Sequence, residues 1–351
     1  MIDQSPLDSC VLRAVGDLSA GYGGVMVSLG MTLGLYQALA GAGPISPQAL
    51  AARTGGAERS VREWLNAQAA GGDVGYHASR ATDELSPAQA MGLADDDSPV
   101  FIPHAWQVPA SRWFDADKAI AAFRTGKGVA WGAHDGRLSG GVAAFDRQAD
   151  RGRLVSAWLP ALDGVVERLE AGRAVADVGC GHGHATVLMA EAFPRSRLHG
   201  GDAHAASIEA ARRHAAEAGL AARVTCAVAR AADSPGQPYG LICFFDCRHD
   251  LGDPVAAARH AAEVLAPDGT VMLVEPFAHD RVEDNRSPVA RLYDAASTPL
   301  GWAHALAEGG RLVLGAQAGE ARLAEVLRKA GCTRLRRAAE TPLNLILDAR
   351  R

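Results

Sequence analysis

The chain contains very little lysine and few aromatic residues. Of its 35 basic residues only three are lysines, Lys118, Lys127 and Lys329, and aromatic residues make up 5% of its 351 positions. The formal net charge is −5. Proteins that bind nucleic acid usually present a positive field to the phosphates. This charge balance therefore argues against nucleic acid as the partner.

Long apolar runs are absent as well. The apolar stretches are short and are broken by glycine or by charged residues, so we expect no transmembrane helix. Residues 1–10 carry two aspartates and no cationic stretch before an apolar core, so we expect no signal peptide. The sequence thus predicts no membrane partner and a cytoplasmic location.

Cysteine pairs with the spacing of a metal site are also missing. The chain has six cysteines and no CxxC motif. Cys243 and Cys247 lie four positions apart at the end of an expected strand, which is poor spacing for zinc. We expect free thiols in a reducing cytoplasm and no bound metal.

The chain does have enough apolar residues, 48%, to bury a sizeable core, and its length suggests about two domains. We expect a winged-helix-like domain over residues 1–100 and a Rossmann-like domain over residues 171–351. Residues 101–170 should form a helical connector that covers the substrate.

The first of these segments has the order of elements of a winged helix. Ser46-Pro47 is a typical helix start, because serine caps the first turn and proline fits it. The pattern predicts a helix over 10–42, a second from Ser46-Pro47, a third over 58–69 and two short strands near 73–76 and 84–86.

A winged helix can bind DNA or can serve as a dimerisation or lid module. The DNA interpretation would use Arg53, Arg59 and Arg62. Glu58 and Glu63 interrupt these arginines, and the segment has no lysine, so the phosphate-binding signal is weak. We favour the dimerisation or lid module and keep a transcriptional regulator as an alternative.

From residue 172 onward, strands alternate with helices. This alternation predicts an α/β fold, a Rossmann-like, doubly wound sheet with helices on both faces, and a final antiparallel hairpin. The seven expected strands cover residues 174–178, 197–200, 224–228, 241–245, 270–275, 333–337 and 343–349. The expected helices cover residues 184–192, 205–218, 254–265 and 320–330. Asp268-Gly269 should begin the fifth strand.

The first of these strands leads into a glycine-rich bend, residues 177–183, and then into a helix. Glycines let the backbone approach a ligand closely, and a helix start offers free N–H groups. No GxxxxGK[ST] motif occurs, which excludes a P-loop. Asp177 precedes the first glycine, where it would repel a pyrophosphate but can hold the ammonium group of S-adenosylmethionine (SAM). A dinucleotide remains the competing ligand.

A second carboxylate stands at the end of the next strand. Asp202 follows Gly179 by 23 residues, the position from which a carboxylate can accept hydrogen bonds from both ribose hydroxyls. Its alternative role is to cap the following helix. Taken together, the strand, the bend, the helix and Asp202 favour SAM.

At this point the sequence resembles the class I SAM-dependent methyltransferases, and in particular the actinobacterial branch with an N-terminal winged-helix dimerisation domain. The resemblance covers nearly the whole chain. It rests on residues 30–36, 59–65, 177–183, 245–254 and 314–320. It implies a homodimer, SAM as the cofactor with S-adenosylhomocysteine (SAH) as its product, and a small-molecule substrate.

The resemblance also implies which residues surround SAM. Asp177, Gly179, Cys180 and Gly181 should surround the methionine part, and Asp202 with Ala203 should hold the adenosine ribose. Arg230 and Ala231 should flank the adenine, and Phe245 and Asp246 should lie near the sulfonium. The sequence departs from the family at Ala203, Arg230 and Gly240, and it lacks the aromatic residues expected around 148–150.

The candidate catalytic residues are His249, Asp250 and His134. His249 and Asp250 follow the fourth expected strand, at the edge where such sheets bind ligands, and histidine is suited to proton transfer near neutral pH. The alternative role for His249 is structural, and His134 could be a surface residue. His249, Asp250 and His304 could instead form a two-histidine, one-carboxylate metal site.

The sequence therefore predicts a methyltransferase that acts on an oxygen or carbon of a small molecule, and we expect this molecule to be a secondary metabolite. Three alternatives stay open. They are a SAM-binding enzyme that catalyses a cyclisation or an elimination, a metal-assisted C-methyltransferase of α-keto acids, and a winged-helix transcriptional regulator.

Overall fold

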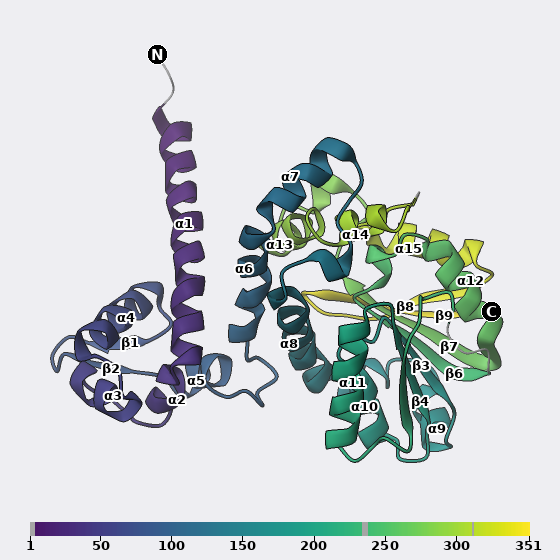
Figure 1. Ribbon diagram of the computed structural model, residues 1–351, viewed down its shortest axis with the longest axis horizontal. Helices are drawn as coiled ribbons and strands as arrows, with labels where there is room; N and C mark the ends of the chain where they lie inside the picture. Colours follow the sequence, from purple (N-terminus) through teal and green to yellow (C-terminus); the bar gives the residue numbers. More distant parts are fainter. Residues whose placement is uncertain (1–3, 234–237, 311) are drawn as a thin grey trace. The chain divides into compact units, whose positions relative to one another are not determined.

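The chain forms two separate units, Met1–Gln107 and Val108–Arg351, in a computed structural model that describes residues 4–233, 238–310 and 312–351 (Figure 1). Each unit has its own hydrophobic core. The three-segment division expected from the sequence, with boundaries at 100 and 170, stays a prediction.

The first unit begins with a long helix, α1 (Gln4–Thr32), which is followed by the short α2 (Leu35–Leu39). The single helix expected over 10–42 is therefore wrong. Gly34, with φ of 67°, breaks it in the left-handed conformation that glycine adopts most readily. Gly30 lets Tyr36 and Trp64 pack closely against α1, because a Cβ there would overlap both rings.

The rest of this unit is a winged helix, as the sequence predicts. Its elements are α3 (Pro47–Thr54), α4 (Glu58–Gly71), β1 (Gly75–His77), β2 (Thr82–Glu84) and α5 (Pro87–Leu93). The Ser46 side chain accepts a hydrogen bond from the Ala49 amide and so caps α3. The two strands pair antiparallel to form the wing.

The three arginines of the DNA interpretation have contacts within this unit. Arg59 forms an ion pair with Glu63, Arg62 forms one with Glu58, and Arg53 donates to the Ala38 carbonyl. The intervening glutamates thus neutralise two of the charges that a phosphate contact would need.

The second unit starts with helices and turns. These are α6 (Gln107–Phe114), α7 (Ala116–Thr125), η2 (Trp131–Ala133), α8 (Arg137–Arg153), the π-helical turn η3 (Leu154–Trp158) and α9 (Val165–Glu170). This agrees with the largely helical segment expected before residue 171.

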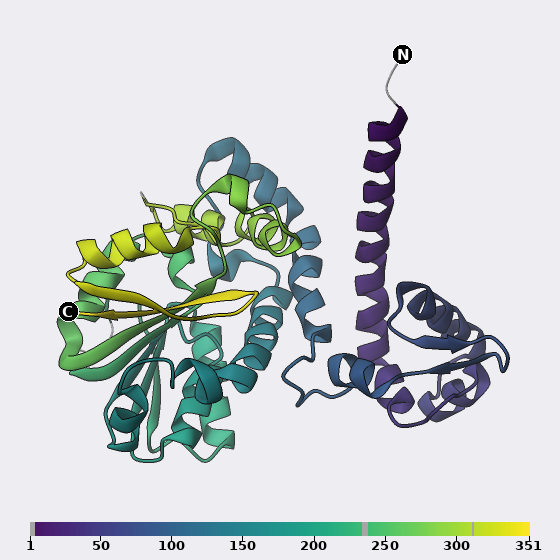
Figure 2. The ribbon, with the colours of Figure 1, turned by 180° about the vertical axis from the view of Figure 1, so that it is seen from behind.

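A seven-stranded sheet follows in the order β5-β4-β3-β6-β7-β9-β8, and the last two strands form an antiparallel hairpin (Figure 2). The pairs from β5 to β7 are parallel, and β9 runs antiparallel to β7. The strands are β3 (Val175–Val178), β4 (Leu198–Asp202), β5 (Val224–Val228), β6 (Tyr239–Phe245), β7 (Leu265–Pro276), β8 (Arg334–Glu340) and β9 (Asn344–Arg350).

Helices cover both faces of this sheet, as expected for a doubly wound fold. One core cluster contains Met189 of α10 (His184–Ala192) and Ile208 of α11 (Ala205–Glu217). The other contains Ala257 of α12 (Pro254–Val264) and Leu323 of α15 (Gly319–Lys329). Successive strand residues alternate between the two clusters because side chains alternate across a strand. The sequence did not predict α13 (Pro288–Ser297) and α14 (Gly301–Ala307).

The start of the fifth strand differs from the expectation. β7 begins at Leu265, which pairs with Tyr239, and the register then shifts so that Thr270 pairs with Leu241. Asp268-Gly269 therefore lies within an irregular stretch of the strand rather than at its start.

Among the residues that the structure describes, no helix combines the length and the apolar character needed to cross a bilayer.

Candidate functional site: a cavity at the carboxyl edge of the sheet

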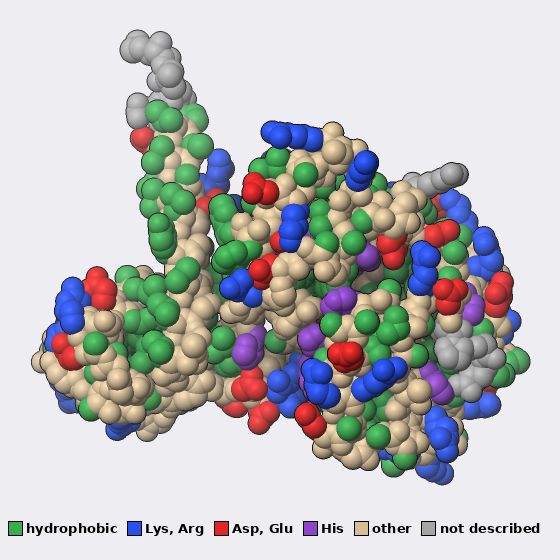
Figure 3. All heavy atoms as spheres, viewed as in Figure 1, with side chains coloured by type: hydrophobic (Ala, Val, Ile, Leu, Met, Phe, Trp, Pro, Cys, Tyr) green, Lys and Arg blue, Asp and Glu red, His purple; other side chains and the backbone are tan. Residues whose placement is uncertain are grey.

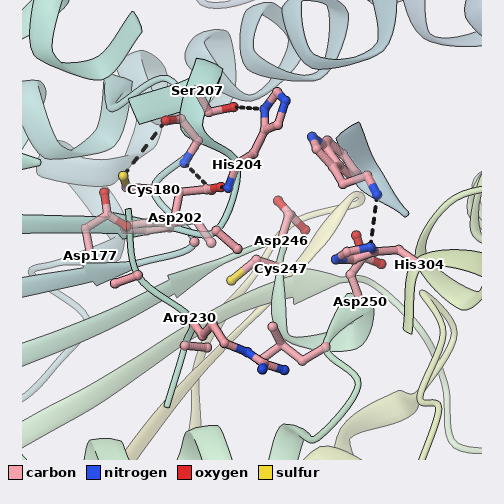
Figure 4. Close-up of a pocket in the computed structure, with 18 of the residues that line it drawn as sticks. Asp177, Cys180, Asp202, His204, Ser207, Arg230, Asp246, Cys247, Asp250 and His304 are labelled. Carbon is pink, nitrogen blue, oxygen red and sulfur yellow. Dashed lines mark hydrogen bonds between the residues drawn. The ribbon is translucent and has the colours of Figure 1, made fainter. Parts of the chain in front are cut away.

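A cavity of about 710 Å³ lies in the second unit, where β3, β4 and β6 end (Figure 4). Open parallel sheets bind their ligands at this edge. All of the predicted cofactor-binding residues line it, namely Asp177, Gly179, Cys180, Gly181, Asp202, Ala203, Arg230, Ala231, Phe245 and Asp246. The structure thus brings together residues that lie up to 69 positions apart in the chain, as far as from Asp177 to Asp246.

Two features favour glycine at the bend: the positive φ of Gly179 and Gly181, and the lack of room for a Cβ on Gly179. Gly179 and Gly181 have φ of 76° and 52°, in the left-handed region. A Cβ on Gly179 would lie 2.7 Å from Cys247 Sγ. The bare backbone therefore forms one wall of the cavity and leads directly into α10.

Asp202 precedes α11, whose N-cap is His204 without a side-chain hydrogen bond, so the alternative role of Asp202 as a helix cap is not observed. Its Oδ2 accepts a hydrogen bond from the Gly181 amide at 3.0 Å, and its Oδ1 accepts one from the His204 amide at 2.7 Å. The carboxylate thus joins the glycine bend to the start of α11. Each oxygen keeps a lone pair with which it can accept from a ribose hydroxyl.

Asp177 has an unsatisfied oxygen. Its Oδ2 accepts a hydrogen bond from the Thr186 hydroxyl, whereas its Oδ1 is buried and has no hydrogen-bond partner among the described residues. The side chain is 1% exposed, and burial raises the pKa of Asp177 to about 7. A buried carboxylate oxygen without a donor fits a cationic ligand group such as the ammonium of SAM.

Asp246 stands at the end of β6 in a strained conformation, with φ of 46°. Positive φ is uncommon for a residue other than glycine. The Asp246 amide donates to the Val274 carbonyl at 2.8 Å, and Asn344 Nδ2 lies 3.3 Å from Oδ2. These contacts hold the Asp246 backbone so that its side chain points into the cavity (Figure 4).

Two further carboxylates, Asp146 and Asp150, line the cavity from α8. They lie one turn apart, and Ser139 and Ala143 continue the same face of the helix. Asp150 is 7% exposed. Burial raises the pKa of Asp146 to about 7 and raises that of Asp150 well above its usual value. The sequence reasoning missed both residues, although their helical spacing was a usable signal.

His249 lies between two carboxylates. Its Nδ1 is 2.6 Å from Glu275 Oε2, and its Nε2 is 3.0 Å from Asp250 Oδ1. Glu275 lies on β7, and its Oε1 accepts from the Arg248 amide at 3.0 Å. The sequence analysis did not single out Glu275, because it is the last residue of the strand expected over 270–275 and belongs to no motif. Asp250 is among the residues that line the cavity, but His249 is not.

The structure does not bring His134 to the cavity. Its Nδ1 is 3.1 Å from Asp115 Oδ2 and 3.0 Å from Arg112 Nη1, and the side chain is buried. Burial, together with the Arg112 charge, lowers the pKa of His134. The same turn reaches the cavity through Trp131 and Gly132 instead. The covering role expected of this segment stays a prediction, and His134 is not among the residues that line the cavity.

The alternative of a metal site at His249, Asp250 and His304 is not supported. His304 Nδ1 accepts a hydrogen bond from the Trp131 amide at 3.1 Å, and its Nε2 is 3.7 Å from Glu308 Oε1. Both nitrogens of His249 face carboxylates. Within the described residues, no group of three or more His, Cys, Asp or Glu side chains could hold a metal ion.

One departure from the family has a packing reason. At Gly240, where an acidic residue is usual, a Cβ would lie 2.7 Å from the Cβ of Arg173. The glycine therefore makes room for Arg173, which forms an ion pair with Asp268.

The chain matches two family models. Residues 175–269 match the model described as a methyltransferase domain, and residues 21–94 match the Rv2258c-like winged HTH domain. A comparison with curated proteins finds no match.

Solved structures with a similar fold include three small-molecule methyltransferases. Mitomycin 7-O-methyltransferase MmcR is 20% identical, with a TM-score of 0.65 over 99% of this chain and 100% of that one. Human N-acetylserotonin methyltransferase in complex with SAM is 15% identical, with a TM-score of 0.68 over 97% of both chains. NcsB1 from neocarzinostatin biosynthesis, in complex with SAM and a naphthoic acid, is 20% identical, with a TM-score of 0.60 over 97% and 98%.

The second unit therefore contains a methyltransferase domain, and the first contains a winged helix. Together they have the fold of the class I SAM-dependent methyltransferases. The winged-helix domain, the methyltransferase domain and the fold class expected from the sequence are confirmed.

Proposed function

We propose that this protein transfers the methyl group of SAM to an oxygen atom of a small molecule, a secondary metabolite. The observation that carries the proposal is Asp177 Oδ1, which is buried at the glycine bend and has no hydrogen-bond partner among the described residues. Oxygen is favoured over carbon because the similar structures include a mitomycin 7-O-methyltransferase. The NcsB1 complex holds an aromatic acid, which supports a small organic acceptor.

The residues of the cavity fit SAM. Asp177 would hold the ammonium group, Asp202 the ribose hydroxyls, and Arg230 with Ala231 the adenine edge. When bound, SAM supplies a methyl group on a positively charged sulfur. Carboxylates such as Asp146 and Asp246 favour a cation in this buried space.

The acceptor would lie beside Asp250, against the cover formed by Trp131 and His304. Methyl transfer requires that the acceptor oxygen is held in line with the methyl group and that its proton is removed. Asp250 and His249 stand where such a proton would leave. The cover excludes water from the transfer.

The proposal can be tested with the purified protein. We expect calorimetry to detect binding of SAH, and incubation with methyl-labelled SAM and a metabolite extract to give a labelled small-molecule product. Absence of SAH binding would refute the proposed function. Turnover of the extract that proceeds equally well with SAH in place of SAM would indicate cyclisation or elimination instead.

SAM binding should depend on pH in a defined direction. Because burial raises the pKa of Asp177 to about 7, the carboxyl is largely protonated below that pH, and pairing with an ammonium must release its proton. We therefore expect SAM to bind more tightly as the pH rises from 5 to 7, with a Kd that falls by up to about tenfold for each pH unit. Calorimetry in buffers of different ionisation enthalpy should detect the released proton, and a flat profile would contradict this.

We also propose that the protein is a homodimer through α1. Along this helix, large apolar side chains recur at alternating spacings of four and three residues, and all are between 42% and 75% exposed. They are Val11, Val15, Leu18, Tyr22, Val25 and Leu29. Figure 3 shows hydrophobic side chains along α1. Such a heptad-like stripe fits the same stripe of a second copy.

Leu18→Glu should weaken this dimer. A carboxylate in the apolar stripe would lose its water without gaining a partner, at a cost of about 1–3 kcal/mol, so the dissociation constant should rise by about tenfold or more. Ala20→Glu, on the opposite face of α1, is the matched control and should leave the dimer intact. Sedimentation equilibrium distinguishes them, and a wild-type monomer at all concentrations would exclude the interface.

We further propose a cytoplasmic location. All six cysteines are free thiols. Free thiols persist in reducing compartments, which supports this assignment.

A further inference from the structure

Asp146 and Asp150 lie one turn apart on α8, and both line the cavity. Asp150 is 7% exposed. Neither carboxylate has a hydrogen-bond or ion-pair partner among the described residues. Burying a carboxylate without a donor is costly, so both side chains fit a cationic group that a ligand supplies.

The two carboxylates lie at different distances from the cover of the cavity. The helix α8 lines the cavity from Ser139, shortly after the cover residue Trp131, to Asp150 near its other end. Asp146 is therefore the nearer of the two to the cover, against which the acceptor would lie. Asp150 is farther from it.

The electrostatic influences on the two carboxyls agree with this order. Burial raises the pKa of Asp150, and the charges of Asp146 and Asp177 raise it further, so Asp150 lies within reach of the glycine bend. Burial also raises the pKa of Asp146 to about 7, while His249 lowers it and Asp250 raises it. Asp146 therefore stands on the acceptor's side of the cavity, and Asp150 stands nearer to the cofactor.

SAM would account for only part of this negative charge. It carries two cationic groups, the ammonium and the sulfonium, and it brings a carboxylate of its own. Asp177 would meet the ammonium, and Asp150, the next carboxylate along the cavity, would face the sulfonium. This leaves Asp146 without a cationic partner on the acceptor's side.

Positive side chains are scarce around the cavity. Among the lining residues that the structure describes, there is one arginine, Arg230, and no lysine. Burial lowers the pKa of His184 to about 3 and also lowers that of His182, so both of these rings are neutral near pH 7. An acidic acceptor would be repelled at Asp146, whereas a basic one would be attracted.

We propose that the acceptor carries a protonated amine besides the oxygen that receives the methyl group, and that Asp146 binds this ammonium. The inference rests on the proposed methyl transfer to oxygen, and it gives the acceptor a chemical class, that of basic hydroxylated small molecules. A nitrogen paired with Asp146 keeps its proton and has no lone pair, so the oxygen remains the nucleophile. The ammonium in turn favours the ionised form of the buried carboxyl.

The charge of the natural acceptor tests the inference directly. A metabolite extract is passed over a cation exchanger at about pH 6. The unbound fraction and the fraction eluted with ammonia are dried and incubated separately with the protein and methyl-labelled SAM. We expect labelled small-molecule product from the eluted fraction only. Product from the unbound fraction would overturn this inference and leave the proposed function standing, whereas absence of SAH binding would refute the proposed function.

Asp146→Asn tests the assigned residue with the acceptor found in this way. The KM for the acceptor should rise by about 30-fold or more, because one partner of a buried charge pair is removed. The Kd for SAH should change little, which also shows that the fold is intact. The matched control is Asp117→Asn, at an exposed position on α7, which should leave both constants unchanged. An unchanged KM in Asp146→Asn would overturn the assignment.

Acetylation of the acceptor amine removes the same ion pair from the other side. It abolishes the positive charge, so the KM of the wild type should rise about as much as it does in Asp146→Asn. Asp146→Asn should use the amine and its acetylated form about equally well, since the pair is already broken. Equal KM values of the wild type for the two compounds would exclude an ion pair with the acceptor.

Discussion

Asp177→Asn is expected to weaken SAM binding by at least about 30-fold, equivalent to about 2 kcal/mol or more. The substitution keeps the size of the side chain and its contact with Thr186, but it removes the charge that the ammonium would meet. Removing one partner of a buried charge pair leaves the other without compensation. Calorimetry with SAM and with SAH measures the loss directly.

The same variant has a second expected effect, of opposite sign, on the protein without ligand. Because the buried Asp177 Oδ1 has no partner in the described part of the chain, replacing the carboxyl with a neutral amide should not destabilise the fold. The melting temperature should stay the same or rise. Asp268→Asn is the matched control and should keep SAM affinity. Equal SAM affinity of Asp177→Asn and wild type would show that the ammonium lies elsewhere.

Gly301→Ala is expected to lower methyl transfer by about a hundredfold, because an added Cβ would overlap Asp250 Oδ1 and push that carboxylate away from its place beside His249. The Asp250 side chain can rotate, so the fold should survive. SAH affinity should change little, since Gly301 is not among the residues that line the cavity.

The control for this substitution is Gly140→Ala. Gly140 lies within α8 and has open space at the Cβ position, so alanine should stabilise the helix by about 0.5–1 kcal/mol and leave activity unchanged. Equal activity of Gly301→Ala and Gly140→Ala would show that the placement of Asp250 is not critical for catalysis.

Some elements of the fold could be predicted from the sequence because their signals are local. Ser46-Pro47 marks the start of α3 through a cap, and β5 and α10 have the predicted bounds. The glycine bend could be recognised because glycine adopts the positive φ of residues 179 and 181 most readily. Two boundaries were not predicted from the sequence: the break at Gly34 between α1 and α2, and the start of β7 at Leu265.

The catalytic part of the site was less predictable, because its contacts join distant segments. Glu275 is 26 residues from His249 and reads in the sequence as one residue of a buried strand. Asp146 and Asp150 precede the sheet and carry no motif. His134 had the right residue type in the right covering segment, but Asp115 and Arg112 hold it away from the cavity.

The order of strands and helices along the chain, the bend at 177–183 and the carboxylate at Asp202 could be found from the sequence, because backbone conformation and side-chain periodicity depend on neighbouring residues. The tertiary structure alone decided that His249 lies between Glu275 and Asp250 and that α14 packs on them. The protonation of a histidine depends on the charges within a few ångströms, and those charges come from parts of the chain that only folding brings together.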